Sequence, residues 1–387
     1  MKKLIIVNNN LETGGVQTSL VNLLGEIKDK YDVTLLLFYV KPEQMSRIPK
    51  NVKLVTINSP FKHFGSSARE TKGTPFMFLA RAFWVGFAKL FGQYAAVKLM
   101  LPFQKKYKGY DYAISFLHEG VRERLYGGCN EFVLNKIEAK QKLTWVHCDL
   151  RLRGSNMEAN RKIYQKFDKI VTCSEGCRKA FLECLPEFAD KTVSVRNCND
   201  YEKIKNLAGD GIEYDEECFN IVTVARLSQE KGIERAFEAL SECVKHGFKV
   251  KYHVVGSGDG ENFLKSKVDE LGLEDTVVFY GNKQNPYPYI KNADLFLLTS
   301  YHEAAPMVFD EAACLGVPVL ATETTSTDDM IKKCNHGIVC KNEQSDITEK
   351  LLAIVAQPQR LCEIRGKLAE EKFDNREAVS KLQEILV

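Results

Sequence analysis

The sequence lacks the cysteine spacing that marks most small metal and redox sites. Its 387 residues include twelve cysteines, but no two of them form a Cys-x-x-Cys pair. Zinc ribbons and thioredoxin-type sites usually present that pair, so neither kind of site has local support. We therefore predict that the protein holds no metal ion and that most of its cysteines are buried thiols.

The sequence also has little that would export the protein or span a membrane. Residues 1–10, MKKLIIVNNN, contain a short apolar run without a small-residue cleavage site, which favours a buried strand over a signal peptide. No run of about 18 uncharged apolar residues occurs, which argues against a spanning helix. From these absences we expect a cytoplasmic protein with reduced cysteines.

Net charge is low for the whole chain but not for its halves. The 54 basic and 51 acidic residues give a total of +3. Residues 1–200 contain 32 basic and 19 acidic residues, a net charge of +13, and residues 201–387 contain 22 and 32, a net charge of −10. A basic half joined to an acidic half indicates two domains with different partners.

The second half alternates short β-branched runs with amphipathic helical stretches. Continuous apolar strands with helical crossovers are typical of a parallel sheet that is covered on both faces, which is a doubly wound α/β domain. Strands are expected at 219–227, 251–256, 277–281, 294–300, 317–322 and 337–340, and helices at 233–245, 261–271, 286–292 and 307–315.

The first half shows the same alternation less regularly. We predict an α/β chain of two Rossmann-like domains, at 1–198 and 199–372, joined where polar residues interrupt the pattern. A C-terminal helix in 373–387 can pack on either domain. Strands are expected at 4–7, 33–38, 52–57, 112–116, 142–146, 169–173 and 192–195, and helices at 17–28, 161–166 and 376–386.

Two glycine-rich loops follow predicted strands. Gly14 and Gly15 come between the first strand and a helix, where glycine lets the backbone turn tightly and a helix N-terminus offers N–H groups to an anion. A plain strand-to-helix turn fits as well, and the dinucleotide fingerprint Gly-x-Gly-x-x-Gly is absent there. Gly256 opens a second loop, Gly256-Ser-Gly-Asp-Gly260, which fits either phosphate approach or a turn that needs positive φ.

A pair of cations follows the first strand of the second half, in Ala225-Arg-Leu-Ser-Gln-Glu-Lys-Gly232. Arg226 ends the expected strand and Lys231 opens the next helix. Ligands bind at this edge in open α/β sheets, and a guanidinium with an ammonium suits an oxygen-rich anion. A surface ion pair with Glu230 or Glu234 explains the same residues equally well.

The segment Ser300-Tyr-His-Glu-Ala-Ala-Pro-Met-Val-Phe-Asp-Glu311 follows a strand and opens a helix near Pro306, a good first helical residue. A helix starts within the segment Ala304, Ala305, Pro306 and Met307. Its free backbone N–H groups would point at an anion. Glu303 lies beside that anion site, and Glu311 lies about two turns into the helix, where a carboxylate suits a diol. Glu303 also fits a simple helix N-terminal charge.

Two histidines follow strands of the first half. His147 comes just after a strand end, at a position that we expect to face a crevice rather than the core. A neutral imidazole there can donate or accept a hydrogen bond near a substrate. His118 is a second candidate of the same kind. An ordinary structural role explains either residue.

Together these elements resemble the retaining nucleotide-sugar glycosyltransferases of family 4, the glycosyl transferases group 1 of bacterial polysaccharide synthesis. The matching elements are the Gly14–Gly15 loop, Arg226-x4-Lys231, and the Glu303/Glu311 pair, in that family's order. Gly316-Val-Pro-Val319 and the 281–298 segment also match. The resemblance implies a type-B fold, in which two Rossmann-like domains face each other across a cleft.

The resemblance also implies the roles of these residues. Arg226 and Lys231 would hold the donor diphosphate, Glu311 would accept the ribose hydroxyls, and Glu303 would lie near the transferred sugar. The segment Ala304, Ala305, Pro306 and Met307 would border sugar and phosphate, with the amides of Ala304, Ala305 and Met307 as donors and Gly256 nearby. His147 would contact the sugar, and Gly15 would let its loop close. No metal or other cofactor is implied, because cationic side chains and helix N-termini replace it.

The family retains anomeric configuration, and the usual proposal is front-face attack assisted by the leaving phosphate, so no general base is assigned. This sequence departs from the family at Ala304 and Ala305, where glycine and a larger apolar residue are usual. The added methyl group of Ala304 bears on which sugar the donor carries. Residues 324–329 also replace a common Gly-Pro turn.

The expected function is transfer of a sugar from a nucleotide-sugar donor, UDP- or GDP-linked, to a lipid-linked or growing glycan acceptor. A sugar-nucleotide epimerase or a phosphorylase on the same architecture remains an alternative. A phosphorylase would normally carry pyridoxal phosphate on a lysine. Ala304 and Ala305 motivate a third alternative, a non-catalytic partner subunit that stabilises an active transferase.

The basic half has a segment that suits a membrane surface. Residues 61–108 contain nine basic and one acidic residue among many aromatic ones, a composition that suits an anionic bilayer. A helical core with a solvated face is the alternative, since Arg81, Lys89 and Lys98 do not share one helical face. We expect peripheral association at the inner face of the cell membrane and, without a recognition motif, no nucleic-acid binding.

Overall fold

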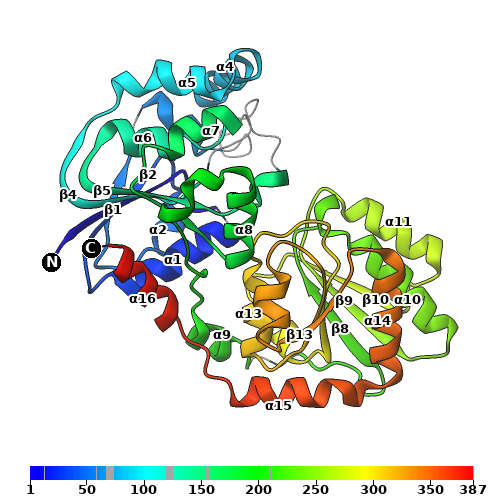
Figure 1. The fold of residues 1–387 in the computed structure, drawn as a ribbon. Coiled ribbons are helices and arrows are strands. Elements are labelled where there is room, and N and C mark those ends of the chain that lie inside the picture. Colours follow the sequence, from blue (N-terminus) through cyan, green and yellow to red (C-terminus); the bar gives the residue numbers. More distant parts are fainter. Residues whose placement is uncertain are drawn as a thin grey trace. The chain divides into compact units, whose positions relative to one another are not determined.

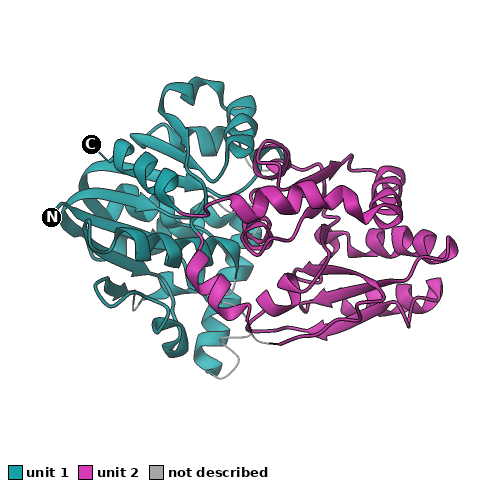
Figure 2. Cartoon of the chain, turned by 90° about the horizontal axis from the view of Figure 1, so that it is seen from below, with its two compact units in different colours: residues 1–198, 375–387 teal, residues 199–374 magenta. Residues whose placement is uncertain are grey.

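The chain folds into two compact units, and each combines a parallel sheet with covering helices. Unit 1 comprises Met1–Cys198 and Asn375–Val387, and unit 2 comprises Asn199–Asp374 (Figure 2). The computed structural model describes residues 1–12, 14–57, 59–66, 74–118, 125–152, 157–209 and 211–386.

Unit 1 is built on a seven-stranded sheet in the order β3-β2-β1-β4-β5-β6-β7, and every paired strand is parallel (Figure 1). Its central strand β1 shows why the sheet is covered on both faces. Leu4 and Ile6 belong to one apolar cluster, whereas Ile5 and Val7 belong to another. Alternate side chains of a strand point to opposite faces, so a continuous apolar run needs helices on both. The strands are β1 (Lys3–Asn8), β2 (Asp32–Leu37), β3 (Lys53–Thr56), β4 (Tyr107–Ser115), β5 (Ile137–Val146), β6 (Lys169–Thr172) and β7 (Thr192–Ser194).

The C-terminal helix α16 (Arg376–Ile385) lies in unit 1, which the sequence left open. Leu382 is fully buried in the cluster that covers one face of the sheet, and Tyr112 donates a hydrogen bond to the Leu386 carbonyl at 2.9 Å. The other helices of the unit are α1 (Gly15–Ile27), α2 (Pro42–Met45), α4 (Pro75–Phe91), α5 (Gln93–Met100), α6 (Cys129–Lys136), α7 (Met157–Tyr164) and α8 (Glu175–Cys184).

Unit 2 repeats the plan with a six-stranded parallel sheet in the order β10-β9-β8-β11-β12-β13. Leu295 and Leu297 of β11 pack on one face, and Phe296 and Leu298 pack on the other. The strands are β8 (Phe219–Val224), β9 (Val250–Val255), β10 (Val277–Gly281), β11 (Leu295–Leu298), β12 (Val319–Thr322) and β13 (Gly337–Cys340). The α-helices are α9 (Tyr201–Leu207), α10 (Ile233–Lys245), α11 (Glu261–Leu271), α12 (Tyr287–Lys291), α13 (Met307–Cys314), α14 (Gln344–Ala356) and α15 (Cys362–Glu370).

Both sheets reverse their strand order at one place, between β1 and β4 in unit 1 and between β8 and β11 in unit 2. At such a switch point the loops after two neighbouring strands separate to opposite faces and leave a crevice at the carboxyl edge of the sheet. The predicted α/β fold of two doubly wound domains is confirmed. No helix was predicted from the sequence at α2, α4, α5, α6, α8, α9, α14 or α15. For α4 and α5 the reason is that the 76–100 segment is apolar on nearly every side and shows no clear period.

Candidate functional site

The switch point of unit 2 brings together the two loops with predicted charged residues. One loop follows β8 and contains the 3-10 turn η5 (Gln229–Lys231), and the other follows β11 and leads into α13. Gly232 joins them: its φ is +56°, and a Cβ added there would lie 2.5 Å from the Thr299 carbonyl oxygen. Thr299 in turn donates its hydroxyl to the Gly232 carbonyl at 2.7 Å. Only glycine combines this backbone conformation with so close an approach.

Lys231 and Glu303 form an ion pair across these loops. The distance from Lys231 Nζ to Glu303 Oε1 is 2.5 Å, and the two side chains are only 18% and 11% exposed. Ser300 donates its hydroxyl to the same carboxylate oxygen at 2.8 Å. The pair places one cation and one anion, held by charge-assisted hydrogen bonds, at the crevice where α/β sheets bind ligands.

Glu311 lies on α13, half-buried beside the fully buried Phe309 and Ala312. Burial, together with the smaller effect of the neighbouring Asp310 charge, raises the pKa of the Glu311 carboxyl to about 7. Within the described part of the chain this carboxylate accepts no hydrogen bond, so its acceptor capacity is left for a hydroxyl-bearing ligand.

Arg226 does not join Lys231 and Glu303 in this structure. Its guanidinium pairs with Glu230 at 2.7 Å, and the two side chains are 70% and 50% exposed. This is the surface ion pair that the sequence allowed as the alternative. The residue nevertheless stands at the carboxyl end of β8, two residues beyond the strand, on the same loop as Lys231.

The Gly256 loop packs against the loop that carries Arg226. Gly256 has a φ of +146°, and a Cβ there would come within 1.8 Å of the Ala225 carbonyl oxygen. Leu227 also donates its amide to the Ser257 carbonyl at 3.0 Å. The glycine is therefore explained by backbone packing and by positive φ, the second of the two readings that the sequence offered.

Ala304, Ala305, Pro306 and Met307 form the entry to α13, with one correction. Pro306 is the residue before the helix, with φ −70° and ψ 120°, and the helix begins at Met307 rather than at the proline. The fixed φ of proline suits both positions, but its ψ here is extended. Ser326 donates its hydroxyl to the Ala304 carbonyl, which fixes the loop, and the first amides of α13 have no partner within the helix.

His147 is placed differently from our prediction. It follows β5, but it is only 8% exposed and does not face solvent. Its ring stacks on Trp145 at 5.9 Å and packs on Phe116 at 4.7 Å between ring centroids. Burial lowers the pKa of His147 to about 3, so the imidazole is neutral, and its Nε2 atom is buried with no hydrogen-bond partner among the described residues. His118, the second candidate, is also buried, at 3% exposure.

In unit 1 the loop after β1 leads directly into α1. Gly14 precedes the helix in an extended conformation, with φ 178°, and Gly15 is its first residue. The sequence reasoning missed the asparagines of this loop. Asn10 is buried, donates to the Gly65 carbonyl at 2.8 Å and accepts from the Gln17 amide at 3.2 Å. The signal was the run of three asparagines directly after an apolar strand, where polar side chains must find partners.

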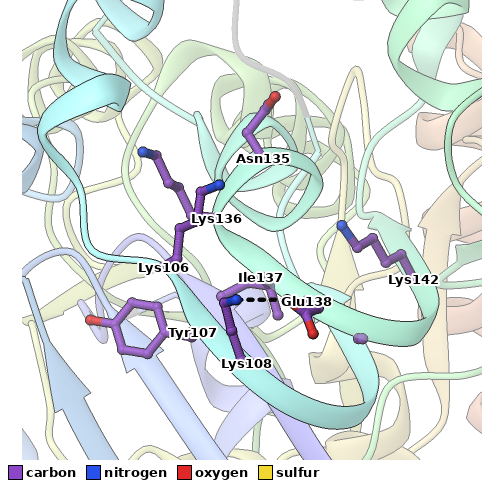
Figure 3. A pocket seen from close by; sticks show the side chains of 9 residues that line it. Lys106, Tyr107, Lys108, Asn135, Lys136, Ile137, Glu138 and Lys142 are labelled. Carbon is purple, nitrogen blue, oxygen red and sulfur yellow. Dashed lines mark ion pairs between the residues drawn. The ribbon is translucent and has the colours of Figure 1, made fainter.

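A separate surface pocket of about 220 Å³ lies at the amino ends of β4 and β5 (Figure 3). Lys106, Lys108, Lys136 and Lys142 line it, and Lys108 pairs with Glu138 at 3.5 Å. None of the residues predicted for the site contributes to this pocket. Elsewhere in the described residues, no three His, Cys, Asp or Glu side chains gather as metal ligands would, and no described helix has the length and apolarity to cross a membrane.

A family model and two curated relatives are similar to parts of this chain. The family model for glycosyl transferases group 1 matches residues 212–372. The amylovoran biosynthesis glycosyltransferase of Erwinia amylovora is 29% identical over 179 residues, which are 43% of this chain and 44% of that protein. The alpha-monoglucosyldiacylglycerol synthase of Streptococcus pneumoniae is 28% identical over 182 residues, which are 45% and 41%. The chain thus spans less than half the length of these curated relatives.

A solved structure matches both units. The crystal structure of the Anabaena protein HepE in complex with UDP and glucose is similar to this chain with a TM-score of 0.69. The two chains are 18% identical, and the likeness covers 100% of this chain and 99% of the other. At that identity the likeness concerns the fold, and it confirms the type-B class of two Rossmann-like domains.

Proposed function

We propose that the protein is a glycosyltransferase, because residues 212–372 match the model of the glycosyl transferases group 1 family. It moves a sugar from a nucleotide-sugar donor to a lipid-linked or growing glycan acceptor in cell-surface polysaccharide synthesis. The amylovoran relative supports a role in polysaccharide synthesis, and the diacylglycerol relative supports a lipid acceptor. The ion pair of Lys231 and Glu303 at the switch point of unit 2 is the observation on which the proposal depends most.

The donor binds unit 2, at the carboxyl edge of its sheet. Lys231 supplies a cation to the diphosphate, and Arg226 joins it by exchanging the exposed Glu230 for a phosphate oxygen. Glu311 accepts the ribose hydroxyls, since its carboxylate is half-buried and accepts no bond from the described residues. The likeness to a protein crystallised with UDP and glucose makes UDP-glucose the first donor to test.

Charge stabilisation at the leaving group provides the catalysis. As the bond to the sugar breaks, negative charge grows on the departing diphosphate, and preorganised cations stabilise it most in a partly buried site. Lys231 is held in place by Glu303 before the donor arrives, so little reorganisation is needed. The reaction proceeds without a metal and with retention of configuration, and the leaving phosphate accepts the acceptor proton.

The protein works in the cytoplasm, where nucleotide sugars are the substrate, and meets its acceptor at the inner face of the membrane. Unit 1 provides the acceptor side. The net charge of +13 in residues 1–200 would concentrate the protein near anionic lipid or an anionic glycan.

Transfer of radiolabelled glucose from UDP-glucose to a membrane extract tests the proposal. We expect turnover by the native protein and a loss of about a hundredfold or more in Lys231→Ala, the size found when one stabilising donor is removed. Lys245→Ala is the matched control, because Lys245 is 65% exposed and, among the described residues, pairs only with Glu242 on the surface of the same unit. Equal turnover of Lys231→Ala and the native protein would refute the assignment. An isomerised donor without any acceptor would indicate an epimerase instead.

A further inference from the structure

Helix α4 turns a row of large apolar side chains to solvent. Phe76, Leu79, Phe83 and Leu90 are 82%, 67%, 63% and 76% exposed, and we call these four residues the apolar stripe. Their spacing of three, four and seven residues places them on one face of the helix. A face that remains in water is normally polar, and clustered exposed apolar side chains mark an interaction surface.

The opposite side of α4 accounts for its attachment to unit 1. Ala88 is buried, and Trp84 and Val85 pack against the core of the unit. Arg81 also turns inward, where its Nε donates to the Ser66 carbonyl at 2.8 Å. The helix is therefore apolar on both sides: one side covers the core, and the other side, the stripe, is covered by nothing in the described chain.

Exposed apolar groups continue after α4. Leu99 on α5 is 52% exposed, and Phe103 in the short turn η2 (Leu101–Phe103) is 83% exposed. Lys136 of α6 donates to the Pro102 carbonyl at 3.3 Å and ties this turn to the body of the unit. Figure 1 shows α4 and α5 together at one end of unit 1.

The charge around these side chains has one sign. Residues 74–110 contain six basic residues and no acidic residue, and every one of the basic residues except Arg81 is an exposed lysine. Lys106 and Lys108 line the pocket of Figure 3 together with Lys136 and Lys142. A surface that combines aromatic and aliphatic groups with lysines complements an anionic bilayer, which offers acyl chains and negative head groups together.

We propose that α4 lies in the surface of an anionic lipid bilayer, with the apolar stripe among the acyl chains and the lysines of residues 89–108 among the head groups. A second copy of the chain is a poorer partner, because a symmetric contact would bring two sets of lysines together. The proposal deepens the proposed function, on which it rests for its biological meaning: it gives the surface by which the enzyme reaches a lipid-linked acceptor.

The structure revises the sequence argument on this point. In the sequence, the basic residues Arg81, Lys89 and Lys98 do not share a helical face, which favours a helical core with a solvated face. The four residues of the apolar stripe do share one, and that face is exposed. Lipid-facing helices are recognised by the position of their apolar side chains, since lysines reach the head groups from several positions on long flexible stems.

Flotation of the full-length protein with vesicles tests the proposal. The vesicles contain phosphatidylglycerol and phosphatidylcholine, or phosphatidylcholine alone. We expect binding to the anionic vesicles at low salt and a partition coefficient lowered by about tenfold or more in the double variant Leu79→Ser/Phe83→Ser. Each of Lys105→Ala and Lys106→Ala should lower it about fivefold, an effect that high salt removes.

The matched control is Val244→Ser/Phe263→Ser, which removes two apolar groups that are 41% and 54% exposed in unit 2. It should float like the native protein. The proposal is overturned if the native protein does not bind anionic vesicles at low salt, or if the α4 variant binds as well as the native protein. It is also overturned if sedimentation shows a dimer that the α4 variant loses. UDP binding measured on the same samples reports on the proposed function separately, since none of these residues belongs to the donor site.

Discussion

At the scale of single residues, two ion pairs that involve the loop after β8 differ in burial and therefore in what they contribute. Lys231 and Glu303 are 18% and 11% exposed, whereas Arg226 and Glu230 are 70% and 50% exposed. A largely buried carboxylate that loses its cation keeps its desolvation cost, but an exposed one is solvated by water.

We therefore predict that Lys231→Ala lowers the free energy of unfolding by about 2 kcal/mol, and that Arg226→Ala changes it by less than about 0.5 kcal/mol. Urea titration of both variants beside the native protein measures the difference. Equal losses in the two variants would show that the burial of the Lys231 pair has no energetic consequence.

Glu311 makes stability and ligand binding depend on pH in opposite directions. Its folded pKa, about 7, is raised above the usual value of 4.5 by burial. The folded state therefore holds a proton that the unfolded state releases, so this stabilising contribution is complete below about pH 4.5 and is lost as pH rises towards 7. Hydroxyl groups of a ribose need the ionised form, so binding of a nucleotide should strengthen over the same interval.

The expected result is a UDP affinity that rises between about pH 5.5 and pH 8 in the native protein and stays flat in Glu311→Gln. Calorimetry over that range measures it. The Glu311→Gln variant should also gain stability relative to the native protein near pH 8 but not near pH 5. A native affinity that is independent of pH would contradict the role of Glu311 in binding.

The position of Lys231 and Glu303 near the carboxyl edge of the sheet was predictable from the sequence, but their contact with each other was not. Each of these two residues follows a predicted strand, and parallel strands end at the same edge of the sheet. Their contact depends on the reversal of strand order between β8 and β11, which local sequence does not reveal. The same limit explains why the burial of His147 was not predicted. We expected its ring at a crevice, but the ring packs against Phe116 and Trp145. Burial depends on residues that are distant in the sequence.

At the scale of elements, the start of α10 depends on one glycine. Gly232 has φ +56° and lies against the Thr299 carbonyl, so any side chain there meets both backbone strain and a clash. Gly25, in the middle of α1, is the opposite case, since a Cβ there would meet nothing within 4 Å.

We predict that Gly232→Ala costs about 2 kcal/mol or more and abolishes transfer, since it separates the loops that hold Lys231 and Glu303. Gly25→Ala should stabilise the protein by about 0.5–1 kcal/mol. Thermal unfolding and the transfer assay, applied to both variants, measure these effects. A harmless Gly232→Ala would mean that the contact between the two loops is dispensable.

Most elements could be predicted because their side-chain periods are clear. The predicted ranges 233–245 and 261–271 coincide with α10 and α11, whose apolar residues recur on one face. Helices α4 and α5 could not be predicted, since a helix that is apolar on two sides has no period that distinguishes it from a buried strand. Strands β4 and β5 begin five residues earlier than expected, in stretches where lysines and tyrosines alternate with other residues.

At the scale of the whole molecule, the C-terminal residues stabilise the unit to which the N-terminus belongs. Leu382 of α16 is fully buried in unit 1, although unit 2 separates it in sequence from the rest of that unit. We predict that Leu382→Ala costs about 2–5 kcal/mol, as large-to-small changes in a core do. Hydrogen exchange should show lost protection in β1 and β2 but unchanged protection in β8 and β9. Equal loss in both units would show that they unfold as one.

The division of charge between the halves acquires a physical meaning from the fold. The half with a net charge of −10 contains the candidate donor site, so Arg226 and Lys231 are local cations in an acidic unit. The half with +13 contains α4 and its lysines. The sequence showed this division, but only the structure showed that the apolar stripe of the basic half faces outward.

The most direct test of the account is calorimetric titration of the native protein and of Lys231→Ala with UDP and with GDP. The account predicts saturable binding of at least one of these nucleotides to the native protein, weakened tenfold or more, about 1.4 kcal/mol, in Lys231→Ala. Lys245→Ala should bind like the native protein. If neither nucleotide binds, or if Lys231→Ala binds as tightly as the native protein, unit 2 is not a nucleotide-sugar site and the proposed function is wrong.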